Sequence, residues 1–547
     1  MKPRRLLWLL VDGLSLKLFR LLEPELPLAF ARILPLEPLS PNCQTPPSLF
    51  SIWSGLPVAA HGLTGYTMPA RQHGAPLAMD DAFVAWPRDI PMVWDRWARS
   101  GGTVRTCAVP FVQPDRLGPA LLSHSHVYGP SLARPQVLRS GEALVIDALG
   151  IRWSVEAGDH CMRLTGTPQG CVEIAFDTTR HLRLPESAAP SLAGQTHRAI
   201  AVRATRIDGE PCLCSLGFQP VLIQGEHAQA RCAALQDLAY CAANPARLYV
   251  GSRLGRRIDE DGAGEAEALL LDLLDCVHRS FLDDLLWTLE SEGGDLVVAY
   301  YPLIDLLSHQ LLRQVVEPRT ASEFALAGSV LRRAATWLGE LFVECGARLT
   351  PDSRFIAHAD HGMMPIVHEV CPNQCLLHNG WLVADATGDI DVTRSLAFYH
   401  PAENGWIALH PERMASAGLS PEDLVETLNR SPGAALDGRF ELIEGPPHSA
   451  GQGWTSTWYL QPPARVRLRA SLRYPLMAPA RKGGDHTCWS DDPWLKGVLL
   501  EPRANSPDWT QPLELTDLAP ALLGWLRDMH GSPVHHMPTP PRLAPCT

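Results

Sequence analysis

The chain carries the sequence LLWLLVDG at residues 6–13, and this stretch decides the fold class. Its first six residues form an unbroken apolar run, which is typical of a strand buried on both faces of a parallel sheet. The run ends at Asp12 and Gly13, and open α/β sheets bind their ligands at the carboxyl ends of their strands. We therefore expect an α/β protein with a carboxylate at the ligand-binding edge of its sheet.

Segments with helical apolar spacing, each followed by a strand-like run, occur near the start of the chain and again in its second half. They lie at 90–109, 265–300 and 321–357. Helix followed by strand indicates a mostly parallel sheet between helical layers. Between them the sequence changes to short strand-like segments separated by Gly, Pro and Asp, at 143–146, 151–155, 198–204 and 220–223.

This change of pattern divides the chain into four predicted parts. Residues 1–110 form the first part of the α/β core, and residues 111–240 form an inserted β-rich cap that leans over the ligand-binding edge of the sheet. Residues 241–530 complete the core, and 531–547 form a proline-rich tail.

Composition excludes several classes of protein. The chain has 547 residues, so more than one hydrophobic core is expected. Its formal charge of -12 and its lack of a dense Lys/Arg block disfavour a stable nucleic-acid partner. The apolar runs are far shorter than the roughly 18 residues of a membrane span, so no membrane partner is expected. The cysteines lack paired CxxC motifs, and the first residues lack a cleavage site for a signal peptide, so we expect a cytoplasmic protein with reduced thiols. The sequence does not indicate an oligomeric state.

Four segments place Asp or His just after a predicted strand or turn: LLVDGL, YPLIDLLSH, IAHADHGM and GGDHTCW. A single such residue is more often a cap or part of a solvated pair. Together they supply three carboxylates and three imidazoles, which suit two divalent metals of the zinc type better than magnesium or calcium. The candidate ligands are Asp12, Asp305, His309, Asp360, His361 and His486.

A candidate nucleophile precedes a predicted helix in the segment CQTPPSLFSIWSGLPVAAHG at residues 43–62. Thr45 is followed by two prolines and a helical run, which places its hydroxyl where a helix N-terminus favours anions. The alternative is that Thr45 only caps the helix. His61, in the same segment, is expected to be structural. Much later in the chain, Gly483 and Gly484 are expected to form a turn rather than a phosphate-binding loop.

These motifs resemble those of the alkaline phosphatase superfamily, most closely the type I phosphodiesterase/nucleotide pyrophosphatase branch and its related phosphohydrolases. The segment LTDLAPALLGWL at 515–526 is similar to the superfamily's closing segment. The motifs follow the family's order over residues 1–110 and 293–529. The resemblance implies an alkaline-phosphatase-like core with an inserted domain.

The resemblance also implies roles for the candidate residues. Thr45 matches the nucleophilic threonine that forms a covalent phospho-threonine and contacts a metal. Asp12, Asp360 and His361 match the ligands of that metal, and Asp305, His309 and His486 match the ligands of the other. The implied cofactors are two divalent ions, zinc with manganese as the alternative. The implied activity is hydrolysis of a small-molecule phosphodiester or pyrophosphate.

Two departures from the family pattern concern substrate recognition. Ser48 and Tyr66 stand where nucleotide pyrophosphatases usually carry asparagines, so both are candidate substrate-binding residues, and a nucleotide diester is less strongly implied. The alternatives are a phosphomonoesterase, a phosphonate hydrolase or a phosphomutase of the same superfamily. A sulfatase is disfavoured because TPPSL lacks the C/S-x-P-x-R motif. The non-enzymatic alternative is an inactive scaffold or binding protein.

Overall fold

The computed structural model describes residues 4–70, 75–117, 131–191, 197–225, 228–241, 244–291, 293–503 and 509–530. The predicted tail at 531–547 lies outside these residues, as does part of the predicted cap at 118–130.

The centre of the molecule is a six-stranded sheet in the order β2-β25-β15-β1-β14-β5. The strand β1 pairs in parallel with both β14 and β15, and β14 pairs in parallel with β5. At the other edge, β25 pairs antiparallel with β15 and with β2. The sheet is therefore mostly parallel, as predicted. The strands are β1 (Leu6–Val11), β2 (Arg32–Leu36), β5 (Val104–Cys107), β14 (Leu296–Tyr301), β15 (Arg354–His358) and β25 (Gly497–Glu501).

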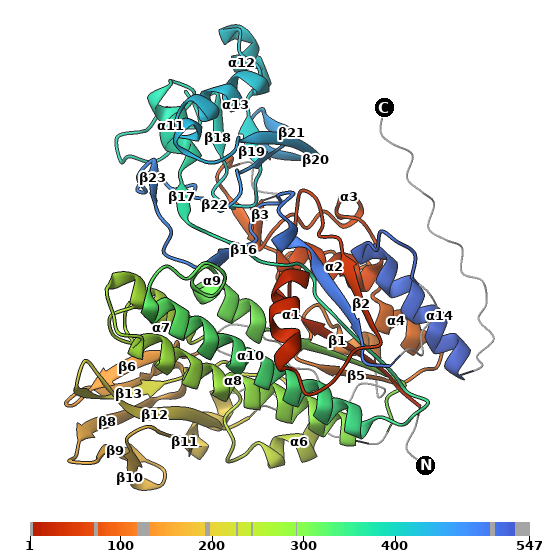
Figure 1. Ribbon diagram of the computed structural model, residues 1–547, viewed down its shortest axis with the longest axis vertical. Coiled ribbons are helices and arrows are strands. Elements are labelled where there is room, and N and C mark those ends of the chain that lie inside the picture. Colours follow the sequence, from red (N-terminus) through yellow and green to blue (C-terminus); the bar gives the residue numbers. More distant parts are fainter. Residues whose placement is uncertain are drawn as a thin grey trace.

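Helices cover both faces of this sheet (Figure 1). One layer packs together α1 (Leu16–Leu22), α8 (Glu265–Glu290), α9 (Leu303–Val316) and α10 (Ala321–Arg348). The other contains α2 (Thr45–Ser54), α4 (Val93–Arg99) and α14 (Leu518–His530). The predicted α/β class with helical layers on both faces is confirmed. Within the described residues, no helix has both the length and the apolar character that crossing a membrane requires.

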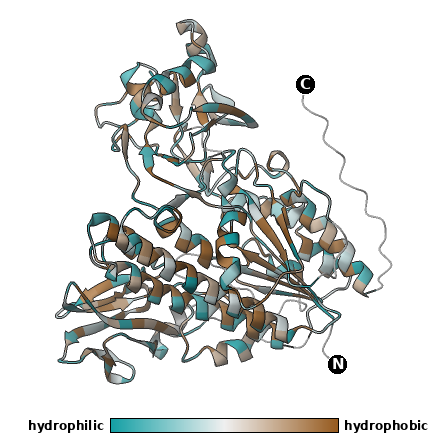
Figure 2. Ribbon diagram, viewed as in Figure 1, coloured by the Kyte–Doolittle hydropathy of each residue, from teal (hydrophilic) through white to brown (hydrophobic). Residues whose placement is uncertain are grey.

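The apolar run of the opening motif lies at the centre of this core. All six residues of β1 are fully buried, and Figure 2 shows that the central strands are among the most hydrophobic parts of the molecule. β1 has strand partners at both edges, and helices cover both faces of the sheet in which it lies. This position explains why its residues are apolar without alternation.

The segment 136–215 forms two antiparallel four-stranded sheets, in the orders β10-β9-β8-β7 and β11-β12-β13-β6. Their strands are β6 (Gln136–Arg139), β7 (Ala143–Ile146), β8 (Ile151–Ala157), β9 (Cys161–Thr167), β10 (Gly170–Ala175), β11 (Thr178–Arg183), β12 (Ala199–Ile207) and β13 (Glu210–Ser215). The two sheets share one apolar core, to which Trp153 and Val202 belong. This is the β-rich insertion that the sequence predicted. Residues 220–223 were predicted as a strand and are not in one.

A second lobe, residues 367–481, has its own apolar core and was not predicted as a separate unit. Its largest sheet has the order β18-β19-β21-β20, and three short helices pack near it (Figure 1). These elements are β18 (Ala397–Tyr399), β19 (Ile407–Leu409), β20 (Glu441–Gly451), β21 (Trp454–Gln461), α11 (Pro372–His378), α12 (Pro411–Ala417) and α13 (Pro421–Arg430).

The remaining short elements lie between the central sheet, the β-rich insertion and the second lobe, apart from β17, β22 and β23, which form a small sheet within the second lobe. They are α3 (Val58–His61), α5 (Pro114–Leu117), α6 (Ala228–Ala234), α7 (Ala246–Val250), β3 (Thr67–Pro69), β4 (Met79–Asp81), β16 (Met364–Pro365), β17 (His368–Val370), β22 (Val466–Leu468), β23 (Met477–Pro479) and β24 (Gly484–Asp485).

The middle of β1 tests how strongly the core depends on the opening motif. Leu9 is fully buried, and its partners in the two neighbouring strands are Ala299 and Ala357. Because these alanines cannot fill the space, we expect Leu9→Ala to lower the free energy of unfolding by about 2–5 kcal/mol, measured by urea denaturation. The matched variant Leu21→Ala, at a side chain that is 43% exposed, is expected to change it by about 0.5 kcal/mol or less. Equal effects of the two variants would contradict the placement of β1.

Candidate metal centre and nucleophile

The six predicted ligands meet at the carboxyl edge of the central sheet. Asp12 follows β1, and Asp360 with His361 follows β15. Asp305 and His309 lie on α9, which begins just after β14. His486 arrives from the other end of the chain, directly after β24. The parallel strands β1, β14 and β15 end side by side, which explains how segments far apart in sequence form one site.

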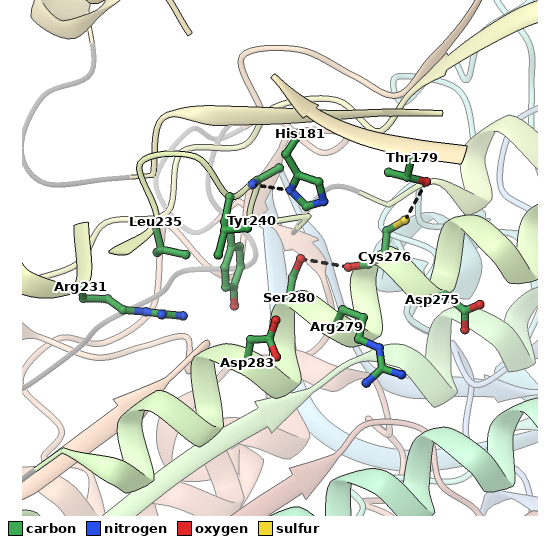
Figure 3. A pocket seen from close by; sticks show the side chains of 12 residues that line it. Thr179, His181, Arg231, Leu235, Tyr240, Asp275, Cys276, Arg279, Ser280 and Asp283 are labelled. Atoms are coloured by element: carbon green, nitrogen blue, oxygen red, sulfur yellow. Dashed lines mark hydrogen bonds between the residues drawn. The ribbon is translucent and has the colours of Figure 1, made fainter. Parts of the chain in front are cut away.

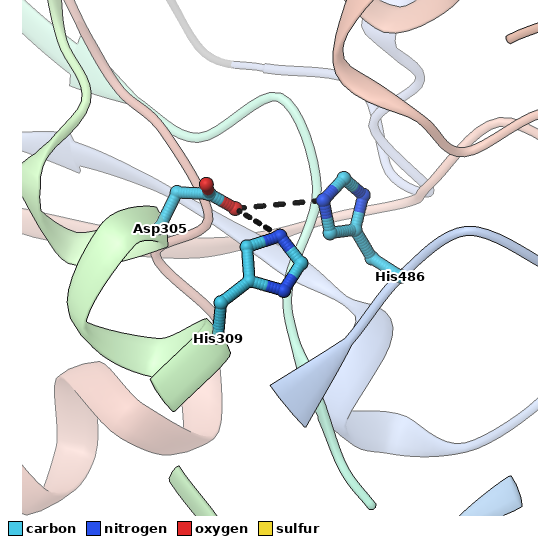
Figure 4. Close-up of side chains that lie close together, drawn as sticks. All are labelled: Asp305, His309 and His486. Carbon is cyan, nitrogen blue, oxygen red and sulfur yellow. Dashed lines mark ion pairs between the residues drawn. The ribbon is translucent and has the colours of Figure 1, made fainter. Parts of the chain in front are cut away.

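Asp305, His309 and His486 form the first group that can hold a metal ion. Asp305 Oδ1 lies 3.4 Å from His309 Nε2 and 3.4 Å from His486 Nε2. Figure 4 shows both imidazoles turned toward this carboxylate. The helical spacing of Asp305 and His309 places their side chains on one face of α9.

Asp12, Asp305 and His361 form the second group. His361 Nε2 lies 3.4 Å from Asp12 Oδ1 and 3.3 Å from Asp360 Oδ2. The carboxylate of Asp305 thus belongs to both groups, whereas the family resemblance assigns it to one metal only. Asp360 stands beside His361, where the resemblance expects it, and the division of ligands between two metals stays a prediction.

All three histidines are held in the same tautomer. The Nδ1 atoms of His309 and His361 each lie 2.9 Å from a backbone carbonyl, those of Gly484 and Gly362. His486 Nδ1 lies 3.4 Å from the carbonyl of Cys43. A carbonyl can only accept, so Nδ1 carries the proton in each ring, and Nε2 presents a lone pair toward the carboxylates. This is how proteins orient a histidine that ligates a metal.

Several buried ligand atoms have no hydrogen-bond partner in the part of the chain that the structure describes. They are Asp12 Oδ1, Asp305 Oδ1, Asp360 Oδ2 and His486 Nε2. A buried polar atom without a partner costs free energy, and a buried charge costs more. Cations placed among these oxygen and nitrogen atoms would remove that cost. The donor set therefore fits two divalent cations of the zinc or manganese type.

The titration behaviour of the cluster agrees with a site made for positive charge. Burial raises the pKa of Asp12 well above its usual range, and the charges of Asp360 and Asp305 raise it further. Burial also raises the pKa of Asp360, to about 7, while it lowers the pKa of His309 to about 4. For Asp305, burial favours a higher pKa, but the neighbouring imidazoles outweigh it and the pKa is lowered. Burial thus raises the pKa of two of the three carboxylates, whereas the imidazoles compensate the charge of Asp305.

Thr45 lies against this cluster as the first residue of α2. Its Oγ1 is fully buried and lies 3.1 Å from His361 Nε2. Because Nε2 has no proton, the threonine hydroxyl donates to it. The same Oγ1 accepts a hydrogen bond of 2.6 Å from the phenol of Tyr66. The structure therefore brings the predicted nucleophile to the predicted ligands.

The two candidate substrate-binding residues differ in position. Tyr66 touches the nucleophile directly, whereas Ser48 is fully buried in α2 with no hydrogen-bond partner for its Oγ among the described residues. Their roles in binding substrate stay predictions.

Gln44, the residue before Thr45, connects three segments around the nucleophile and was missed in the sequence. Its Oε1 accepts from the Tyr66 backbone N–H at 2.7 Å, and its Nε2 donates to the carbonyls of Thr487 at 2.9 Å and Glu403 at 3.1 Å. No local sequence signal marks such a residue, because its partners are distant in the chain.

Groups behind the ligands hold two of the carboxylates in place. The Tyr300 hydroxyl donates to Asp12 Oδ2, and the Gly13 backbone N–H donates to Asp360 Oδ1 at 3.3 Å. Gly13 has a φ of +70°, and a Cβ there would lie 2.9 Å from the Cα of Asp305. The Asp-Gly pair of the opening motif therefore allows α9 to approach β1 closely.

The Gly483–Gly484 pair, predicted as a turn, packs the His486 segment tightly onto α9. A Cβ on Gly483 would lie 2.6 Å from the Gln310 carbonyl oxygen, and one on Gly484 would lie 2.7 Å from the Ser308 carbonyl oxygen. This approach lets the Gly484 carbonyl accept from His309 Nδ1. The glycines thus join the two segments of the first ligand group.

The predicted cap does not lie where we expected it. Among its described residues, β12 contacts α8 through the Arg203–Asp272 ion pair at 2.7 Å. A cavity of about 190 Å³ lies between β11, residues 231–240 and α8 (Figure 3), and no predicted site residue lines it. The second lobe approaches the site instead, through Glu403 and through an ion pair of 3.3 Å between Arg467 and Asp485.

Comparisons with known proteins give weak similarities. No protein-family model and no curated protein matches the chain. Among solved structures, murine ectonucleotide pyrophosphatase/phosphodiesterase 5 is 10% identical, with 96% of this chain and 95% of that chain covered and a TM-score of 0.43. The alkaline phosphatase PafA is 10% identical, with 96% of each chain covered and a TM-score of 0.43. Phosphonoacetate hydrolase from Sinorhizobium meliloti 1021 is 13% identical, with 96% of each chain covered and a TM-score of 0.44.

Similarity at this level carries no argument about activity, so the functional proposal below depends on the geometry of the site.

The close approach at Gly483 can be tested directly. We expect Gly483→Ala to cost about 1–3 kcal/mol of stability and to weaken zinc binding, because its Cβ would push the His486 segment away from α9. Thermal denaturation and competitive zinc titration measure the two effects. The control is Gly346→Ala in α10, where no atom lies within 4 Å of the added Cβ, and it is expected to be neutral or stabilising by up to about 1 kcal/mol. Unchanged zinc affinity in Gly483→Ala would contradict this role.

The raised pKa values of Asp12 and Asp360 predict how metal stabilisation depends on pH. In the cation-free protein these carboxylates keep protons that they would lose in the unfolded chain, so its stability falls as pH rises from about 4 to about 7. Cations displace those protons and bind more tightly at higher pH. We expect the difference in Tm between zinc-loaded and chelated protein to be larger near about pH 8 than near about pH 5.5. A difference that is constant or shrinks with rising pH would count against the cluster as the metal site.

Proposed function

We propose that the protein is a metal-dependent phosphohydrolase that cleaves a small-molecule phosphate ester through a covalent phospho-threonine at Thr45. One observation carries the proposal: the buried Thr45 hydroxyl lies 3.1 Å from His361 Nε2, in a cluster where one oxygen of each carboxylate has no hydrogen-bond partner among the described residues. A hydroxyl that only caps a helix would not need six metal-type ligands beside it. A phosphodiester or a pyrophosphate is the proposed substrate class.

The ligand groups would hold two divalent cations, which neutralise charge on phosphoryl oxygens and lower the pKa of a nearby hydroxyl when they are bound. One cation would be held by Asp305, His309 and His486, and the other by Asp12, Asp360 and His361. Their backbone-anchored imidazoles and buried carboxylates are pre-organised, so little reorganisation accompanies the reaction.

Thr45 would then take part in two displacements at phosphorus. In the first, the Thr45 hydroxyl gives up its proton, a bond forms between Oγ1 and phosphorus, the bond from phosphorus to the leaving oxygen breaks, and the leaving oxygen takes up a proton. In the second, a water oxygen attacks phosphorus, the bond to Oγ1 breaks, and Oγ1 regains a proton. The placement of Thr45 at the start of the ten-residue helix α2 adds the positive end of the helix dipole.

Removal of the nucleophile tests this proposal. We expect Thr45→Ala to lower the hydrolysis of bis-p-nitrophenyl phosphate by the zinc-loaded protein by on the order of 10³-fold or more. The matched control is Ser51→Ala, because Ser51 lies in the same helix and its hydroxyl also pairs with a histidine, His61, at 2.9 Å. That variant removes a buried hydroxyl–imidazole contact outside the cluster and is expected to keep most of the activity.

The same assay separates the alternatives. Parallel measurements with p-nitrophenyl phosphate and p-nitrophenyl phenylphosphonate distinguish a diesterase from a monoesterase or a phosphonate hydrolase. Metal analysis addresses the scaffold alternative: less than one bound metal ion per chain after reconstitution, with no effect of Thr45→Ala, would exclude the enzyme.

A further inference from the structure

The phenol of Tyr66 makes a short hydrogen bond to the nucleophile, 2.6 Å long. A threonine hydroxyl has one proton and two lone pairs. Without cations the proton points to His361 Nε2 at 3.1 Å, and Tyr66 donates to one lone pair at 2.6 Å. A cation held at His361 Nε2 would take the place of that proton, so Tyr66 would stay on one lone pair of Oγ1 and another would be available to attack phosphorus.

The first turn of α2 is poor in other hydrogen-bond donors. A helix N-terminus usually offers several backbone N–H groups to an anion. Here Pro46 and Pro47 have no N–H, and the N–H of Ser48 donates to the Gln44 carbonyl at 3.1 Å. Besides the proposed cations and the N–H of Thr45 itself, a charged oxygen next to Thr45 therefore finds few backbone donors here, and Tyr66 is the side-chain donor that already touches Oγ1.

The position of Tyr66 is fixed from two sides. Its backbone N–H donates to Gln44 Oε1 at 2.7 Å, and its ring packs near the ring of Phe83, with centroids 6.0 Å apart. Since Gln44 directly precedes Thr45, one residue holds both the nucleophile and the phenol. Such a fixed donor is suited to an oxygen on which charge develops during a reaction.

We propose that Tyr66 is a catalytic residue that donates its hydrogen bond to Thr45 Oγ1 while the phospho-threonine is hydrolysed. This inference rests on the function proposed above. When water attacks phosphorus, the bond from phosphorus to Oγ1 breaks and its electron pair stays on Oγ1. One proton of the water ends on Oγ1, phosphate or a phosphate monoester leaves, and Tyr66 keeps its own proton. In the first displacement Oγ1 instead gives electron density to phosphorus, so donation to it does not help there.

This asymmetry predicts a specific kinetic effect. We expect Tyr66→Phe to lower kcat by on the order of 10²-fold, the usual cost of removing one donor to a developing oxyanion. Because the second displacement is slowed and the first is not, the phospho-threonine accumulates and KM falls together with kcat. A pre-steady-state burst of p-nitrophenol close to one per chain is expected, together with a phosphorylated chain in the intact mass spectrum after acid quenching.

Tyr301→Phe is the matched control. Tyr301 is another buried tyrosine whose hydroxyl pairs with a side chain, His278 Nδ1 at 2.7 Å, and it is not part of the site. This variant is expected to keep kcat, KM and a low level of phosphorylated chain. Zinc content and circular dichroism of both variants show whether fold and metal binding are retained.

Three results would overturn the inference. The first is an unchanged kcat in a folded, zinc-loaded Tyr66→Phe protein. The second is a raised KM without accumulated phospho-threonine, which is the result expected of a residue that only binds substrate. The third is full activity of Thr45→Ala, which would remove the proposed function itself. The first two leave that function standing, so the two failures can be told apart.

Discussion

Mutual repulsion of three carboxylates in a space closed to water is the constraint on which the site depends. Asp12, Asp305 and Asp360 are at most 6% exposed, and within the described segments each has an oxygen without a hydrogen-bond partner. Removing an ion from water costs several kcal/mol unless opposite charge compensates it. His309 and His361 supply little, because burial lowers their pKa and favours the neutral rings. Bound cations would supply the missing compensation.

The fold brings these charges together by the simplest means available to an α/β sheet. Adjacent parallel strands end at one edge, and each ligand follows a strand end or sits in the first turns of the helix that follows it. Close backbone approach at Gly13 and Gly483 then closes the gaps between segments. Bulkier residues at these positions would push the segments that carry the candidate ligands apart, so the spacing of the ligands depends on these glycines.

The sequence predicted the parts of the site that local pattern marks. The apolar run at 6–11, the Asp and His residues after strand ends, and Thr45 before two prolines all have short-range signals. The contacts of Gln44 and Tyr300 have none: Gln44 bonds Thr487, 443 positions away, and Tyr300 reads in the sequence as part of an apolar strand. The lobe at 367–481 and the packing of the cap on α8 were missed because both depend on tertiary contacts.

Gln44 directly precedes Thr45, and its side chain accepts from the backbone N–H of Tyr66. The phenol of Tyr66 in turn donates to the Thr45 hydroxyl, so the two residues together support the nucleophile. The proposed function requires that the cluster of Asp and His side chains holds two cations. The most direct measurement is an anomalous difference map, recorded at the zinc edge, from crystals of the zinc-loaded protein. The account predicts two peaks, one beside the Nε2 atoms of His309 and His486 and one beside His361 Nε2 and Asp12. A map with a single peak, or with peaks only away from these atoms, would contradict it.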